Sequence, residues 1–94
     1  MLAKVKLSLR VSGNAFDDEI NSIIEAAKLD LKGGGVFIKA PLDPLIERAI
    51  ILYAKANFGM ANPDSIKYDE AYHNLRQKLS LFGDYNEDTE NVLE

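Results

Sequence analysis

The chain has 94 residues, 47% of them hydrophobic and 28% charged, which is the size and composition of one small globular domain. It contains no cysteine, which excludes disulfides, thiolate metal sites and cysteine nucleophiles. Five of the 15 Asp and Glu residues lie after position 83, so the first 83 residues carry 11 cations against ten anions. This balance argues against a protein held to nucleic acid by phosphate contacts.

The opening segment predicts a short helix over about residues 2–9. Leu2, Val5 and Leu9 share one helical face, whereas Leu7 does not. Three cations among the first ten residues interrupt every apolar run of seven or more, so the segment does not read as a signal peptide. No stretch approaches the ~20 apolar residues that span a bilayer. We therefore expect no membrane partner and synthesis in the cytoplasm.

A second helix is predicted over about residues 15–32. Asn14 is a plausible N-cap, and the acids of Asp17–Glu19 sit where the positive end of the helix dipole favours anions. One continuous apolar stripe runs along it at helical spacing. The stripe consists of Phe16, Ile20, Ile23, Ile24, Ala27 and Leu31.

Three consecutive glycines, Gly33–Gly35, follow this helix. A phosphate-cradling loop would need a preceding strand and a downstream Gly-Lys-Ser/Thr, and neither is present. The glycines are therefore interpreted as a helix exit. The apolar run Val36–Ile38 after them predicts either a brief strand or a segment tucked under the bundle.

A third helix is predicted over about residues 44–58. Asp43 provides a capping carboxylate before Pro44 at the first helical position, and Gly59 lies near the end. Its apolar residues cover more than one face, which predicts a central position in the core or a second face buried against another subunit. They are Leu45, Ile46, Ala49, Ile50, Ile51, Leu52, Tyr53, Ala54 and Ala56.

A fourth helix follows, capped by Asn62 or Asp64 and ending at about Leu81 or Phe82. Gly83 supplies a residue of the kind that ends helices in the left-handed conformation. One apolar stripe recurs at steps of three and four, while four polar residues lie off it and should be solvated. The stripe is Tyr68, Tyr72, Leu75, Leu79 and Phe82, and the polar residues are Glu70, Asn74, Arg76 and Lys78.

No set of residues predicts catalysis, and no metal or cofactor site is expected. His73 is the sole histidine, and Asp69 and Glu70 precede it at helical spacing, which is typical of a weak local ion pair on the surface. A metal site needs three or more convergent ligands. The serines lack a surrounding nucleophile motif such as G-x-S-x-G. We therefore expect a protein that is not an enzyme.

The last eleven residues carry five carboxylates and no cation. Composition favours a disordered, solubilising tail. A segment that orders on a partner is the alternative, because a purely solvating tail has little need of apolar anchors. The possible partner-binding residues are Asp84, Tyr85, Val92 and Leu93.

These elements together predict an all-α fold. It is a compact bundle of about four helices with a short extended segment near residues 36–40 and a flexible acidic C-terminal tail. The helical domain is expected to cover residues 1–83 and the tail residues 84–94.

Three segments in this order resemble the phage head–tail connector (adaptor) proteins, the small helical type often labelled DNA-packaging proteins in phages and prophages of Gram-positive bacteria. The first runs from Asp17 to Lys28 and the second, the most specific, is DPLIERAIILYAKANFGMANPD from Asp43 to Asp64. The third is a closing helix with a Gly-Asp-Tyr end. It matches at Tyr72, Leu75, Leu79, Leu81, Gly83, Asp84 and Tyr85. Residues 33–42 and those after Asn86 match least.

The resemblance implies a structural protein of the virion neck, present in the host cytoplasm before assembly. It implies a homo-oligomeric ring of about twelve or thirteen copies below the portal protein, extending the DNA channel and contacting the next neck or tail-completion protein. DNA would pass through without sequence recognition. By position, residues from Asp84 onward would reach toward the portal.

A second hypothesis does not depend on the resemblance. The chain could be a small helical protein-binding module, a regulator or chaperone that captures a partner helix on its third or fourth helix.

Overall fold

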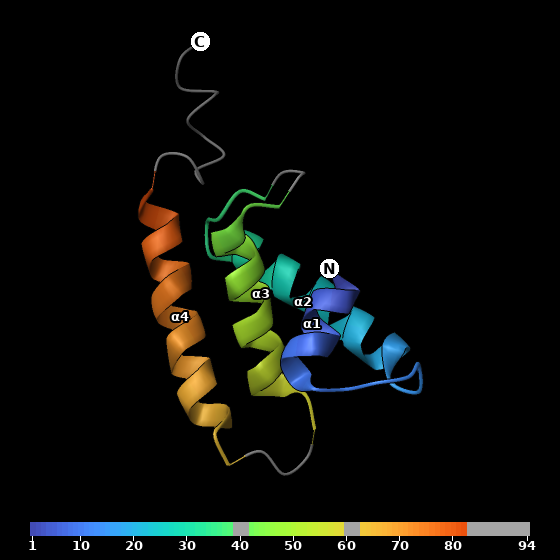
Figure 1. Cartoon of the computed structure of the whole chain (residues 1–94). Coiled ribbons are helices and arrows are strands. Elements are labelled where there is room, and N and C mark those ends of the chain that lie inside the picture. The colour runs from blue at the N-terminus through green and yellow to red at the C-terminus, as the bar shows by residue number, and fades with distance from the viewer. Residues whose placement is uncertain (39–41, 60–62, 83–94) are drawn as a thin grey trace.

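The computed structural model is an all-helical bundle, as the sequence predicted (Figure 1). It describes residues 1–38, 42–59 and 63–82, and no strand forms within these ranges. The run 36–38 belongs to no helix and tucks against the bundle with Val36 buried, so the brief strand considered for it does not form. The helices are α1 (Leu2–Leu9), α2 (Asp17–Gly33), α3 (Pro44–Asn57) and α4 (Ser65–Leu81).

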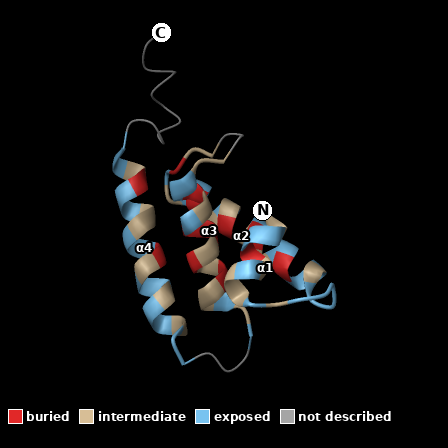
Figure 2. Cartoon of the chain, viewed as in Figure 1, coloured by how far each residue is buried: buried red, intermediate tan, exposed pale blue. Residues whose placement is uncertain are grey.

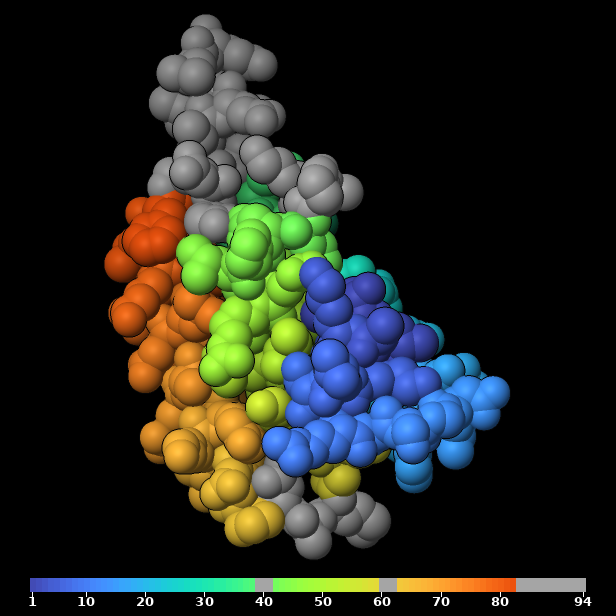
Figure 3. Space-filling model, in the orientation of Figure 1, coloured from blue at the N-terminus to red at the C-terminus, as the bar shows by residue number. Residues whose placement is uncertain are grey.

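Helix α3 is the centre of the bundle. It packs against α4 on one side and against α1 and α2 on the other, and α1 also packs on α2 (Figure 1). The space-filling view shows α3 as a strip between α4 and α1 (Figure 3). The central position accounts for the apolar composition of α3, because three neighbouring helices cover it. Among the large apolar residues of α3, Leu45 stays exposed, with 40% of its surface accessible to solvent.

The core is assembled from the facing sides of all four helices (Figure 2). No polar or charged residue in the described ranges is buried in it. Its buried members are Val5, Ile20, Ile24, Ala27, Leu31, Val36, Ile46, Ala49, Ile50, Leu52, Ala54, Tyr72 and Leu79. Core packing, rather than polar contacts, therefore holds the helices together.

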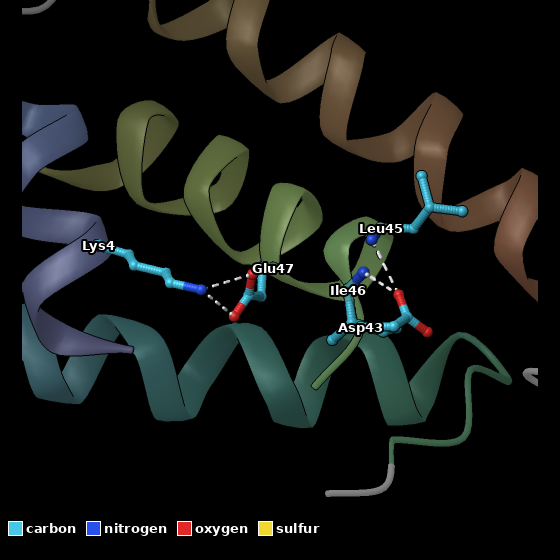
Figure 4. A network of polar contacts seen from close by, with 5 residues as sticks. All are labelled: Lys4, Asp43, Leu45, Ile46 and Glu47. Carbon is cyan, nitrogen blue, oxygen red and sulfur yellow. Dashed lines mark hydrogen bonds and ion pairs between the residues drawn. The ribbon is translucent and has the colours of Figure 1, made fainter. Parts of the chain in front are cut away.

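The start of α3 is capped as predicted. The Asp43 side chain accepts hydrogen bonds from the backbone N–H groups of Leu45 (2.8 Å) and Ile46 (3.0 Å), directly before Pro44 (Figure 4). Two of the free N–H groups at the helix N-terminus are thus satisfied. One turn further along, Glu47 forms an ion pair with Lys4 of α1 at 2.8 Å, which is largely exposed and contributes little stability.

The predicted start of α2 was wrong by two residues. Asn14 is not the N-cap: it lies in a turn, where its backbone oxygen accepts from the N–H of Asp17, and the N-cap is Phe16. The Phe16 ring packs edge-to-face on Phe58 after α3, with centroids 5.6 Å apart. This tertiary contact is the physical reason that Phe16 precedes the helix rather than joining its stripe.

The glycines end α2, which confirms their interpretation as a helix exit. Gly35 adopts the left-handed conformation, with φ +90°. The N–H of Val36 donates to the Leu31 carbonyl (2.9 Å) and that of Gly35 to the Lys32 carbonyl (3.1 Å), which is the Schellman motif. Leu31 and Val36 are both buried, so the motif turns the chain back along α2.

Helix α4 presents most of its predicted stripe to α3. Tyr72 and Leu79 are buried and Tyr68 and Leu75 pack against the core, but Phe82 follows the helix end and is 47% exposed. Asp64 is the N-cap residue, and its side chain makes no capping hydrogen bond. The alternative cap Asn62 and the predicted stop Gly83 lie outside the described residues.

Helix α1 matches its predicted face. Val5 is buried, Leu2 and Leu9 pack against the core, and Leu7 is 80% exposed. The helix ends at Arg10, which takes the left-handed conformation with φ +60° although it is not a glycine.

Candidate interaction surfaces

The residues predicted to bind a partner, Asp84, Tyr85, Val92 and Leu93, lie outside the described part of the chain. Their role therefore stays a prediction. The structure does describe the helix end that leads to them, where Leu81 is 77% exposed. Two grooves in the described part of the chain lie elsewhere, on α1 and α2.

His73 forms the local pair that its spacing predicted. Its Nε2 lies 3.4 Å from an Asp69 carboxylate oxygen, one helical turn away, and both side chains are about half exposed. Within the described ranges, no three His, Asp or Glu side chains come together as a metal site would require. The pair is a surface contact of the kind that stabilises a helix slightly.

The acidic cluster at the start of α2 has a structural partner. The Asp17 carboxylate lies 2.8 Å from the Lys6 Nζ of α1, and the same ammonium donates to the Gly13 carbonyl in the intervening turn. The contact joins the two helices where their connection is tight. It adds to the favourable placement of Asp17, Asp18 and Glu19 at the helix N-terminus.

A polar network between α2 and α4 was not foreseen from the sequence. One oxygen of Asp30, Oδ2, accepts a hydrogen bond from the Tyr72 hydroxyl at 2.5 Å and one from Arg76 at 2.8 Å. Tyr72 is 1% exposed, and the Tyr53 ring packs edge-to-face against it. Burial and, next, the hydrogen bond to Asp30 raise the pKa of the Tyr72 hydroxyl well above its ordinary value.

The expectation that Arg76 would be solvated was wrong. Its side chain is 28% exposed, because it lies across the end of α2 on its way to Asp30. Gly34 makes room for it: a Cβ at that position would sit 2.7 Å from the Arg76 Cδ. Neither residue type signals this contact alone, since Asp30 and Arg76 lie 46 positions apart. The prediction that Glu70, Asn74 and Lys78 are exposed was confirmed.

The Schellman turn creates a groove on the outer side of α2. The returning segment lies beside the helix and encloses an open space of about 290 Å³, which we call the α2 groove. Its lining is mostly apolar and includes the cations Lys28 and Lys32. The lining residues are Glu25, Lys28, Leu29, Lys32, Phe37 and Ile38.

A second groove, the α1 groove, follows the turn after α1. It contains the exposed side chain of Leu7 and the exposed cation Arg10, and it is more open to solvent than the α2 groove. Lys6 also lines it, but its charge is paired with Asp17. Neither groove was foreseen from the sequence, because each depends on how a turn folds back on its helix.

The described helices and the comparisons with known proteins place limits on what the surfaces do. None of the helices in the described ranges is both long and apolar enough to cross a membrane. A family model described as phage connector protein matches residues 1–86. No curated protein and no solved structure matches the chain. The matched span includes all four helices together with Asp84 and Tyr85, and it ends before Val92 and Leu93.

Proposed function

Given that this chain belongs to the phage connector protein family, we propose that it is a subunit of the head–tail connector of a phage. About twelve or thirteen copies form a closed ring below the portal, extend the DNA channel and join the head to the tail. The observation that carries the proposal is the family match, which spans residues 1–86 and so includes every helix of the bundle.

The role is structural rather than catalytic, since the family is one of structural proteins. The polar side chains that converge in the described part of the chain serve the fold. Asp30, Tyr72 and Arg76 join α2 to α4, and Lys6 and Asp17 join α1 to α2. Such contacts suit a subunit that must keep one shape within an assembly.

The charge distribution supports a channel through which DNA passes without sequence recognition. The first 83 residues carry 11 cations against ten anions, whereas a protein that grips DNA neutralises phosphates with a clear basic excess. The acidic C-terminal residues would repel phosphates rather than bind them. DNA can therefore slide through such a ring without being held.

The partners of the ring are the portal on one side and the next neck or tail-completion protein on the other. The acidic residues from Asp84 onward form a partner-binding segment, with Tyr85, Val92 and Leu93 as its apolar anchors. The protein is a component of the virion neck and is present in the host cytoplasm before assembly.

Electron microscopy of the full-length protein, alone at high concentration and mixed with its portal, tests the proposal. We expect closed rings, or portals that carry an additional ring at the exit side. A protein that stays monomeric alone, ignores the portal and binds a short amphipathic helical peptide would overturn the connector and favour the protein-binding module.

A further inference from the structure

We propose that the α2 groove is the docking site for the acidic tail, residues 84–94, of the next copy in the ring. The inference rests on the proposed function, because it names the contact between neighbouring copies of a connector. The resemblance to connectors implies only that the tail reaches toward the portal. The inference adds a specific site on the neighbouring copy.

The groove offers both apolar surface and positive charge. Leu29, which lines it, is 71% exposed, and the half-buried residues Phe37 and Ile38 line it as well. Lys28 is partly neutralised by Glu25, whose carboxylate lies 3.3 Å away. Lys32 also lines the groove, and within the described part of the chain no ion pair engages its ammonium group.

The acidic tail has the complementary chemistry. It carries five carboxylates and no cation, and it includes Tyr85, Val92 and Leu93 as apolar side chains. An apolar lining beside an ammonium group favours a segment that carries both apolar and acidic side chains. No other segment of this chain combines anionic charge of one sign with several apolar residues outside the helices.

The groove and the end of α4, from which the tail continues, lie on different sides of α2. Asp30 points toward α4, where it meets Tyr72 and Arg76. Lys28 and Lys32 lie two positions on either side of Asp30, so they project about 160° away from it around the helix. The groove therefore faces away from α4, while the tail continues from the end of α4.

This arrangement is that of a head-to-tail interface. A subunit with the donor segment on one side and the acceptor groove on the other makes a heterologous contact, and such contacts close into rings when the rotation permits. Each copy would give its tail to one neighbour and receive a tail from the other. The contact is weak by itself and is strengthened by the high local concentration within the ring.

Cysteine crosslinking in the full-length protein tests the assignment. The chain has no cysteine of its own, so each introduced thiol reports one position. Leu29→Cys in one copy and Val92→Cys in a second, differently tagged copy are mixed under the conditions in which electron microscopy shows rings. We expect a disulfide-linked heterodimer on mild oxidation, at about tenfold the yield of the matched control.

The control pairs Val92→Cys with Leu7→Cys, because Leu7 is a similarly exposed leucine at the edge of the α1 groove. Equal yields at Leu7 and Leu29 would overturn the assignment. A single chain carrying both Leu29→Cys and Val92→Cys separates the two sources of the tail. Closure within one chain, rather than chains linked to each other, would also overturn it.

A charge reversal tests whether the positive charge of Lys32 helps to bind the tail. Lys32→Glu should lower the heterodimer yield about fivefold, as expected when an exposed ion pair is replaced by repulsion. Added salt should lower the yield of the Leu29→Cys and Val92→Cys pair that keeps Lys32. Arg10→Glu, the matched change in the α1 groove, should leave the yield unchanged. A yield insensitive to Lys32→Glu and to salt would contradict the docking site.

The outcomes separate this inference from the proposed function. Rings that form but give no Leu29–Val92 crosslink leave the connector standing and remove the groove as the tail's site. A preparation that forms no ring alone or on the portal removes both.

Discussion

The hydroxyl of Tyr72 donates a hydrogen bond to Oδ2 of Asp30 at 2.5 Å, across 42 positions of sequence. The donor is buried in the core and the acceptor lies at the surface of α2, where Arg76 binds the same oxygen. The bond matters because α2 and α4 otherwise meet chiefly through α3, which packs against both.

Loss of the acceptor should destabilise the bundle more than loss of the donor. Asp30→Ala leaves the buried Tyr72 hydroxyl without its partner, so the free energy of unfolding should fall by about 1–3 kcal/mol. Tyr72→Phe removes the hydroxyl itself and should lower the free energy of unfolding by less, about 1 kcal/mol. Urea unfolding at pH 7 measures both, and equal losses would show that the hydroxyl is satisfied by water.

Stability should also fall at alkaline pH because of Tyr72. Burial and the hydrogen bond to Asp30 raise the pKa of its hydroxyl in the folded state, so the unfolded chain loses this proton first. The contribution is fully present below a pH of about 10 and declines above it by up to about 1.4 kcal/mol per pH unit. In urea unfolding from pH 8 to 11, Tyr72→Phe should show a shallower decline, and an identical slope would contradict the assignment.

Two adjacent glycines should respond in opposite directions to alanine. Gly33→Ala places a methyl group in open space at the last residue of α2, so it should stabilise the protein by about 0.4–1 kcal/mol. Gly34→Ala places the methyl group 2.7 Å from the Arg76 Cδ and displaces that side chain from Asp30. The Gly34→Ala protein should be less stable than the Gly33→Ala protein by about 1–2 kcal/mol, as thermal unfolding would show.

Leu79 and Leu81 provide a matched pair on α4. Leu79 is fully buried and Leu81 is 77% exposed, two positions apart. Leu79→Ala should lower the free energy of unfolding by about 2–5 kcal/mol, whereas Leu81→Ala should change it by less than about 0.5 kcal/mol. Circular dichroism during urea unfolding separates the two, and a large loss at Leu81 would mean that this end of α4 is covered.

Deletion of residues 84–94 should separate folding from assembly. The core residues all precede position 80, so the helical signal in circular dichroism should stay nearly unchanged. If residues 84–94 bind a partner as proposed, fewer rings, alone or on the portal, should be seen in electron micrographs. Undiminished assembly by the shortened protein would show that the segment takes no part in it.

Much of the fold could be predicted from the sequence because the signals were local. The Asp43-Pro44 cap, the Tyr72–Leu79 spacing and the Gly33–Gly35 exit each act within a few residues, and the structure confirms all three. The start of α2 was misplaced because Phe16 is held by Phe58, 42 positions away, which no local pattern shows.

The surfaces were less predictable for the same reason. The network of Asp30 and Arg76 needs two helices at a given angle, and the α2 groove needs the chain to return along the helix after Gly35. The charge of the tail was evident from the sequence, whereas Lys32, which we propose as its partner, was one of 11 cations without distinguishing context.

The double attachment of α4, by packing on α3 and by the Asp30 network to α2, bears on how accurately a ring can close. Errors in the angle between successive subunits add up around a closed ring. A small variation in the orientation of each copy therefore becomes a gap or an overlap at the last one. In the proposed ring, a helix fixed at two separate places along the bundle would keep the angle between the end of α4 and the α2 groove the same in every copy. Weakening Asp30 or Arg76 should therefore appear first as rings of mixed size, before any loss of helix content.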